Sequence, residues 1–170
     1  LRGQWEINNS EGIESIGAMR YNYTDTTLQV IMSRLLVVGT GAMGFNHARV
    51  CAEIGVLAGV CDLDENSART VGEKFGSTWF SDVESALSES DIQGVIIATP
   101  TISHEKLASM AMERGLSVLV EKPIASSLNE VDNLISLAEQ KGVVLAVGHV
   151  ERYNPVIAYA KKGLMAGEWG

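Results

Sequence analysis

The segment "LLVVGTGAMGFNHARV" spans residues 35–50 and carries the spacing G-x-G-x-x-G directly after four apolar residues. In such a strand–turn–helix unit, Gly39 suits the tight turn and Gly41 lets the backbone approach a pyrophosphate. Gly44 lets the helix lie close to the strand, so that the helix N-terminus faces the phosphate groups. The segment therefore predicts a dinucleotide-binding turn. Its candidate binding residues are Gly39, Gly41, Ala42, Met43 and Gly44.

An acidic residue ends the next apolar segment. The sequence "VLAGVCD" finishes at Asp62, 18 residues beyond Gly44, near the position where an acid bonds the adenosine ribose hydroxyls. A carboxylate favours free hydroxyls and repels a 2′-phosphate, and residues 63–66 contain no Arg or Lys. NAD is therefore the expected cofactor, in preference to NADP, and Arg69 is the basic residue that could weaken this preference.

Other interpretations of the same glycines compete with this one. Gly39 and Gly44 have the outer spacing of the phosphate loop of nucleoside triphosphatases, but Phe45 stands where that loop requires Lys. A methyltransferase that uses S-adenosylmethionine can have a similar loop and acid, and a glycine turn can also bind nothing. The glycine segment alone leaves the last two alternatives open.

From Met32 onward, short apolar segments alternate with segments of helical spacing, the pattern of a parallel sheet with crossover helices. The strands are nearly all apolar, which is typical of strands covered on both faces. We predict an α/β fold with a six-stranded, doubly wound parallel sheet of the Rossmann type. The strands are expected near residues 34–38, 56–61, 77–80, 94–98, 117–120 and 143–147.

Local signals predict where helices begin, end and pack. Capping boxes start at Ser81 and Ser127, each with Glu three residues later. Gly115 and Gly142 follow helix ends, where a left-handed cap favours glycine. Apolar spacing also predicts two sets of packing residues. The first is Ala42, Met43, Val50, Cys51 and Ile54, and the second is Leu128, Val131, Leu134, Ile135 and Ala138.

Composition limits the partners and the compartment. The chain has 21 acidic and 13 basic residues and a net charge of −8, so we expect no nucleic-acid partner. Its apolar runs are strand-sized, and neither a signal peptide nor a membrane span is supported. Cys51 and Cys61 lack metal-ligand spacing and the three histidines are dispersed, so no metal site is expected. We expect a cytoplasmic protein with two buried, reduced thiols.

The first residues differ from the rest of the chain. Residues 1–31 show no sustained period of 2 or 3.6, and we interpret them as a non-native or disordered extension before Met32. The dinucleotide-binding domain is expected over residues 32–152. Residues 153–170 are expected to begin a substrate domain whose remainder is absent from this chain.

Polar clusters follow the last three predicted strands, at the sheet edge where ligands bind in open α/β sheets. They are Ala98-Thr99-Pro100 with His104 downstream, Glu121-Lys122-Pro123, and the segment 148–155. Glu-Lys-Pro in this setting resembles the Gfo/Idh/MocA family of sugar and cyclitol oxidoreductases. The resemblance extends from Met32 to the end of the chain.

The resemblance implies roles for individual residues. Lys122 is expected beside nicotinamide and substrate, orienting the reacting hydroxyl and assisting its proton transfer, and Glu121 at the nicotinamide-side ribose. Thr99, Pro100 and His104 are expected along the cofactor. Independently of the family, alcohol oxidation removes a hydride from carbon and a proton from oxygen, and a positioned ammonium stabilises the developing alkoxide.

The segment 148–155 is similar to the passage into the substrate domain of members resembling UDP-N-acetylglucosamine 3-dehydrogenases. It adds His149, Arg152 and Asn154 as candidate contacts to nicotinamide or sugar. Arg152 could equally form a salt bridge at a domain interface. His47 has no evident partner and is expected to be structural or exposed.

Complete members of the family carry a second α/β domain that supplies most substrate contacts and usually the oligomer interface. The resemblance implies an NAD-dependent oxidoreductase acting on a sugar, nucleotide-sugar or cyclitol hydroxyl or ketone. It also implies a homo-oligomer at full length, with this chain inactive by itself. The alternative is a non-catalytic dinucleotide-binding module, followed by the methyltransferase.

Overall fold

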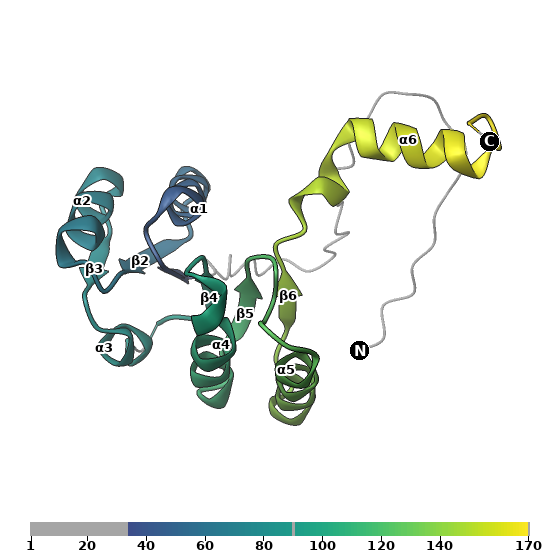
Figure 1. Cartoon of the computed structure of the whole chain (residues 1–170). Helices are drawn as coiled ribbons and strands as arrows, with labels where there is room; N and C mark the ends of the chain where they lie inside the picture. Colours follow the sequence, from purple (N-terminus) through teal and green to yellow (C-terminus); the bar gives the residue numbers. More distant parts are fainter. Residues whose placement is uncertain (1–33, 90, 170) are drawn as a thin grey trace, which may run out of the picture. The chain divides into compact units, whose positions relative to one another are not determined.

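The computed structural model of the chain describes residues 34–89 and 91–169 (Figure 1). The interpretation of residues 1–31 as an extension lies outside the described residues. Within them, strands and helices alternate along the chain in the order expected of crossover connections.

Six parallel strands form one sheet with the order β3-β2-β1-β4-β5-β6. The winding direction reverses between β1 and β4, which are direct neighbours, so the crevice at a topological switch point opens there. Each strand lies within its predicted range, and the predicted six-stranded, doubly wound fold is confirmed. The strands are β1 Leu35–Val38, β2 Leu57–Cys61, β3 Thr78–Phe80, β4 Gly94–Ile97, β5 Ser117–Val120 and β6 Leu145–Val147.

Helices cover both faces of this sheet (Figure 1). Helices α1 and α2 lie on one face, and α3, α4 and α5 lie on the other. A sixth helix, α6, follows β6 and extends away from the sheet. The helices are α1 Ala42–Glu53, α2 Glu65–Phe75, α3 Val83–Leu87, α4 His104–Glu113, α5 Leu128–Lys141 and α6 Pro155–Met165.

The two faces of the sheet have separate cores. Strand β1 contributes to both, because successive side chains alternate between the faces. Val37 packs with Ala48 of α1 in one core, while Leu36 and Val38 belong to the larger core that includes Met112 of α4. The sheet is therefore anchored on both sides, and its strand ends are held in fixed positions relative to one another.

The helix ends agree with the sequence in part. Ser127 caps α5 as predicted by accepting a hydrogen bond from Glu130 N at 3.3 Å, and Gly142 adopts the left-handed conformation with φ +66°. The predicted box at Ser81 is wrong, because Asp82 is the N-cap of α3. Its carboxylate accepts from both the amide and the hydroxyl of Ser85, and these bonds hold the pKa of Asp82 below its usual value.

The predicted packing sets are also corrected. Helix α1 buries Gly44, Ala48 and Cys51, and of its predicted set only Cys51 is buried. Small residues at these positions let α1 lie close to the sheet, so the larger predicted side chains remain outside. Helix α5 buries Leu134 and Ala138 as expected. The members of the two sets that the structure exposes are Ala42, Met43, Val50, Ile54, Leu128 and Ile135.

Helix α6 exposes much of its apolar surface. Among its residues, Val156, Tyr159 and Leu164 are each more than 60% exposed. No helix in the described ranges has the length and hydropathy to cross a membrane. Within these ranges no group of three or more His, Cys, Asp or Glu side chains is arranged to hold a metal ion.

Candidate functional site

The three glycines after β1 have different surroundings. Gly39 has φ +91°, and a Cβ there would lie 2.7 Å from the carbonyl oxygen of Ala98. A Cβ at Gly44 would overlap the carbonyl oxygen of Gly39. At Gly41, by contrast, no described atom beyond its chain neighbours lies within 4 Å of the Cβ position. The fold therefore requires two of the glycines, and the third leaves open space for a ligand.

Helix α1 begins at this open space. Gly41 is its N-cap, and among the described residues no side chain caps the helix and none in its first turn is acidic. The first amide groups of a helix have no partner within it, and the helix dipole adds a partial positive charge there. Ala42 and Met43 form the exposed start of this turn. The predicted phosphate-facing residues thus lie together at an uncapped N-terminus suited to an anion.

Asp62 directly follows β2 and is held against the glycine loop. Its Oδ2 accepts from the Thr40 amide at 2.7 Å and from the Thr40 hydroxyl at 2.8 Å, and its Oδ1 accepts from the Asp64 amide at 3.0 Å. Burial favours the neutral form, but these hydrogen bonds outweigh it and lower the pKa of Asp62. The carboxylate is therefore ionised at neutral pH and fixed beside the loop.

Thr40 and Ser67 are two further polar residues beside Asp62 that the sequence patterns did not indicate. Thr40 is 5% exposed, and its Oγ1 lies 2.6 Å from Ser67 Oγ. Thr40 lies between Gly39 and Gly41, so its position in the glycine loop could have identified it from the sequence. Ser67 belongs to α2 and reaches the loop only through the fold.

Thr99 and Pro100 follow β4, across the switch point from the glycine loop. A Cβ at Gly39 would lie 2.9 Å from Cγ2 of Thr99, so the two turns are in close contact. The Thr99 hydroxyl lies 2.8 Å from the Ser103 hydroxyl, and the exposed Pro100 begins the turn that leads into α4. The structure thus brings these two predicted residues to the same edge as Gly41.

His104 lies buried at the start of α4, between two of the turns at this edge. The residue is 1% exposed, and its Nδ1 and Nε2 lie 2.9 Å and 2.8 Å from the carbonyl oxygens of Pro123 and Thr99. Both ring nitrogens thus face backbone carbonyls within the chain. His104 thus joins the turn after β4 to the turn after β5, and its expected place along the cofactor stays a prediction.

Glu121 and Lys122 follow β5 at the same edge. Glu121 is 5% exposed, and its Oε2 accepts a hydrogen bond from the Lys122 amide at 3.2 Å. Its Oε1 lies 2.8 Å from Nε2 of His47, a residue of α1 whose side chain is 20% exposed. The sequence showed no partner for His47, and the structure supplies one in Glu121. These residues are 74 positions apart, and only the fold brings them together.

An open groove of about 500 Å³ lies beside Lys122. His149 and Arg152 from the segment after β6 line it, together with Ile157 of α6. Asn154 is instead the N-cap of α6, where its Oδ1 accepts from the Val156 amide at 3.0 Å and its Nδ2 donates to Glu151. The structure thus assembles three of the four predicted substrate residues around one groove and gives Asn154 a structural task.

The two cysteines take no part in this site. Both are buried and free. Burial, followed by the charges of Asp62 and Asp82, raises the pKa of Cys61 to about 12, and burial also raises the pKa of Cys51. Their thiols are protonated at neutral pH and are not nucleophiles.

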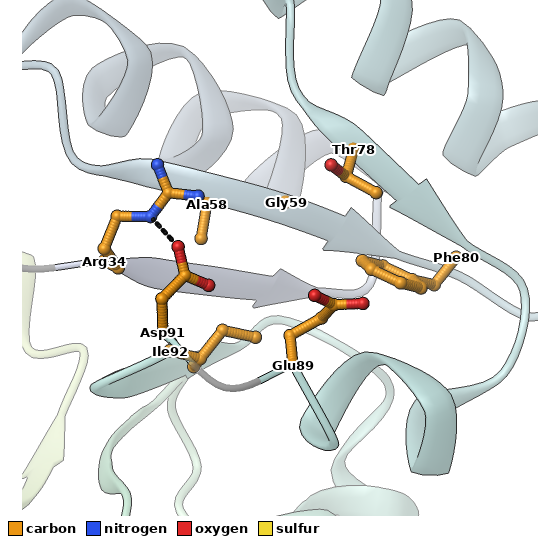
Figure 2. Close-up of a pocket in the computed structure, with 8 residues that line it drawn as sticks. All are labelled: Arg34, Ala58, Gly59, Thr78, Phe80, Glu89, Asp91 and Ile92. Carbon is orange, nitrogen blue, oxygen red and sulfur yellow. Dashed lines mark ion pairs between the residues drawn. The ribbon is translucent and has the colours of Figure 1, made fainter.

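A second pocket lies near the amino-terminal ends of β1, β2 and β3 (Figure 2). Arg34 pairs there with Asp91 at 2.9 Å, and Glu89 also lines the pocket. Its volume of about 30 Å³ is far smaller than the volume of about 500 Å³ of the groove beside Lys122. This pocket is too small for a substrate or a cofactor.

Comparison with protein families agrees with this geometry. The model of GFO_IDH_MocA, described as an oxidoreductase family with an NAD-binding Rossmann fold, matches residues 33–149. The chain belongs to this family. The match confirms the resemblance based on Glu121-Lys122-Pro123 and argues against the methyltransferase alternative.

Individual relatives are also similar over most of the chain. UDP-N-acetylglucosamine 3-dehydrogenase of Acidithiobacillus ferrooxidans is 38% identical over 133 residues, 78% of this chain and 42% of the relative. Its solved structure has a TM-score of 0.71, with 36% identity, over 76% of this chain and 41% of that one. A 2,7-anhydro-N-acetylneuraminate hydratase of Mediterraneibacter gnavus is 32% identical over 79% of this chain and 36% of the relative.

One further solved structure contains a bound cofactor. GenD2 from gentamicin A biosynthesis, solved in complex with NAD, has a TM-score of 0.65 and 34% identity, over 68% of this chain and 34% of that one. The chain thus spans about two fifths or less of the length of the relatives it matches. The names of the first two relatives contain sugar derivatives, and the name of the third structure contains NAD.

Proposed function

We propose that this chain is the dinucleotide-binding part of an NAD-dependent oxidoreductase that transfers a hydride between nicotinamide and a sugar, nucleotide-sugar or cyclitol hydroxyl or ketone. The observation that carries the proposal is the placement of Lys122. It lies at the same sheet edge as Gly41 and Asp62 and lines an open groove. A lysine at that position can assist the proton transfer of alcohol oxidation, a step that a pure binding module does not perform.

The residues at this edge suit the parts of a dinucleotide. Asp62 presents a fixed, ionised carboxylate for two ribose hydroxyls. The open space at Gly41 and the uncapped start of α1 suit the pyrophosphate. The remaining nucleotide then extends over the ends of β4 and β5, toward Thr99, Glu121 and Lys122, because the sheet order continues in that direction.

Lys122 is the candidate catalytic residue. A bound nicotinamide supplies the hydride acceptor or donor. The Lys122 ammonium would orient the substrate hydroxyl and stabilise the oxygen as its proton leaves. The backbone of Lys122 is held by the hydrogen bond from its amide to the Glu121 carboxylate, and Pro123 follows directly. His149 and Arg152 line the same groove and would contact the substrate.

The preference for NAD over NADP belongs to this proposal. The Asp62 carboxylate would repel a 2′-phosphate at the ribose. Arg69, the basic residue nearest in sequence, donates a hydrogen bond from Nη2 to Asn66 at 2.8 Å and is thereby held on α2. It is not directed at Asp62 by any hydrogen bond among the described residues.

Three further expectations accompany the function. Residues 32–152 would form the dinucleotide-binding domain, with 153–170 beginning the substrate domain, since the exposed apolar surface of α6 suits further protein. The full-length protein would be a homo-oligomer. A cytoplasmic location is also part of the proposal.

Calorimetric titration tests the cofactor. The chain should bind NADH more tightly than NADPH, and S-adenosylmethionine should give no heat of binding. Binding of S-adenosylmethionine without binding of NADH would overturn the proposal.

Substitution of Lys122 separates an enzyme from a binding module. In the full-length protein, Lys122→Ala should reduce turnover by about 10²–10⁴-fold, the range for loss of a general acid–base group, while NADH affinity stays within about threefold. Lys161→Ala on α6 is a matched control and should keep both the turnover and the NADH affinity of the wild type. A full-length protein with no turnover of sugars, nucleotide sugars or cyclitols would support the non-catalytic module.

A further inference from the structure

The carboxylate of Glu121 is enclosed by three parts of the molecule that lie far apart in the sequence. His47 of α1 contacts its Oε1 at 2.8 Å, and the Lys122 amide contacts its Oε2 at 3.2 Å. On the third side, a Cβ at Gly148 would lie 2.9–3.1 Å from the carboxylate atoms. The Glu121 carboxylate is therefore hydrogen-bonded on two sides and has Gly148 close on the third.

Gly148 cannot move away to relieve such a contact. Its amide donates to the carbonyl of Val120 at 2.8 Å, which fixes the segment after β6 against the end of β5. Its φ is not in the left-handed region, so the backbone itself would accept alanine. A side chain at this position would therefore press on the carboxylate of Glu121, while the local turn itself does not call for glycine.

His47 links the Glu121 carboxylate to the helix that begins at Gly41. It lies on α1 three residues after Gly44, and its neighbour Ala48 is fully buried, so the histidine backbone is fixed. A carboxylate has about four acceptor positions, of which His47 and the Lys122 amide use two. The others are available to a ligand at the edge of the sheet.

We propose that His47 and Gly148 are positioning residues that hold Glu121 in place for the redox nucleotide of the cofactor. The inference rests on the proposed function and deepens it. With adenosine at Asp62 and pyrophosphate at α1, the second nucleotide lies over β4 and β5, where Glu121 and Lys122 are. ADP, which ends at the pyrophosphate, does not reach Glu121.

The test compares NADH with ADP in calorimetric titrations of the whole chain. His47→Phe keeps a ring of similar size and removes the hydrogen bond, and His47→Gln keeps a donor at a similar distance. Loss of one hydrogen bond to a charged group predicts about tenfold weaker NADH binding for His47→Phe, with ADP binding unchanged within about twofold. His47→Gln should restore NADH affinity to within about threefold of wild type.

Gly148→Ala tests the position of the Glu121 carboxylate from the opposite side. Its Cβ should displace the Glu121 carboxylate and weaken NADH binding about as much as His47→Phe, again without an effect on ADP. If His47→Phe fails to fold by circular dichroism, Gly148→Ala decides by the same comparison. Arg49→Ala, which removes an exposed pair on α1, is the control and should bind both ligands normally.

The outcomes separate this inference from the function on which it rests. Equal losses of NADH and ADP affinity, or unchanged NADH affinity in His47→Phe and Gly148→Ala, would overturn the positioning role while leaving the NAD-binding function intact. A wild-type chain that binds neither NADH nor ADP would overturn the proposed function and this inference with it.

Discussion

The two edges of the sheet carry similar residues in different settings. At the carboxyl edge, the His47 and Glu121 side chains are 20% and 7% exposed and lie 2.8 Å apart. At the amino edge, Arg34 and Asp91 lie 2.9 Å apart, but their side chains are 44% and 57% exposed (Figure 2). The separations are nearly equal, so distance does not distinguish a positioned group from a solvated pair.

Burial and additional bonds make the distinction. A solvated ion pair has many arrangements of similar energy and contributes little to stability. A carboxylate with two hydrogen bonds and a third close neighbour has far fewer arrangements, as Glu121 has with His47 of α1, the Lys122 amide after β5 and Gly148. Asp62, bonded by Thr40 and Asp64, follows the same rule. We therefore expect substitutions at the two edges to have very different effects.

The largest effect is expected at Gly44. The Cβ of Gly44→Ala would overlap the carbonyl oxygen of Gly39, a backbone atom that cannot rotate away as a flexible side chain could. We expect a loss of about 3 kcal/mol in the free energy of unfolding, at the upper end for overpacking, together with loss of NADH binding. Urea unfolding and calorimetry measure the two effects. Wild-type stability in this variant would contradict the close contact of α1 with the loop.

Asp62→Asn should affect binding strongly and the fold less. It removes the charge that accepts two ribose hydroxyls, so NADH affinity should fall about 30-fold or more. The difference between NADH and NADPH should narrow because the repulsion of a 2′-phosphate is lost. Parallel calorimetric titrations measure both, and an unchanged preference would show that another residue selects the cofactor.

Asp62 also predicts a pH dependence of stability. Its carboxyl keeps a lowered pKa in the folded state, so the unfolded chain takes up a proton first as the pH falls. The stabilisation is present above the unfolded pKa of about 4 and is lost as the pH falls through the lower folded value. Urea unfolding of wild type and Asp62→Asn between neutral and acidic pH should show curves that converge at low pH. A constant difference would contradict ionisation of this group in the fold.

Gly41→Ala should separate the loop's binding from its folding. No described atom beyond the chain neighbours is near its Cβ position, and its φ is not in the left-handed region. Its stability should fall by at most about 1 kcal/mol, the cost of alanine at an N-cap. NADH affinity should fall about tenfold, since the Cβ would occupy space at the pyrophosphate. Normal NADH binding would show that the phosphates lie elsewhere.

The smallest effect is expected at the amino edge. Arg34→Ala breaks the exposed pair with Asp91 and should change the free energy of unfolding by less than about 1 kcal/mol. NADH affinity should stay at the wild-type value, because Arg34 lies at the opposite ends of the strands. A change in NADH affinity would contradict the assignment of the site to the carboxyl edge.

The strands and the glycine loop were predictable because their signals are local. An apolar segment bounded by glycine or polar residues specifies a buried strand over a few positions. Gly39 and Gly44 are themselves the signal for the tight turn, because their positions have no room for a side chain. The helix packing sets were predicted less well. Apolar spacing suggested Ile135 and Leu128, but a helix on a sheet buries a narrow face, and these side chains lie outside it.

The sequence by itself was sufficient to predict the parallel sheet, the turn at Gly39 and the acidic residue Asp62 after the second strand. The motif Glu121-Lys122-Pro123 was sufficient to indicate the family. The partners of the polar groups depended on the tertiary structure. His47 meets Glu121 across 74 residues, and His104 is enclosed between the carbonyls of Thr99 and Pro123. Strand order brings such groups together, and it arises from packing of the whole domain, so no local pattern in the chain records which side chains will meet.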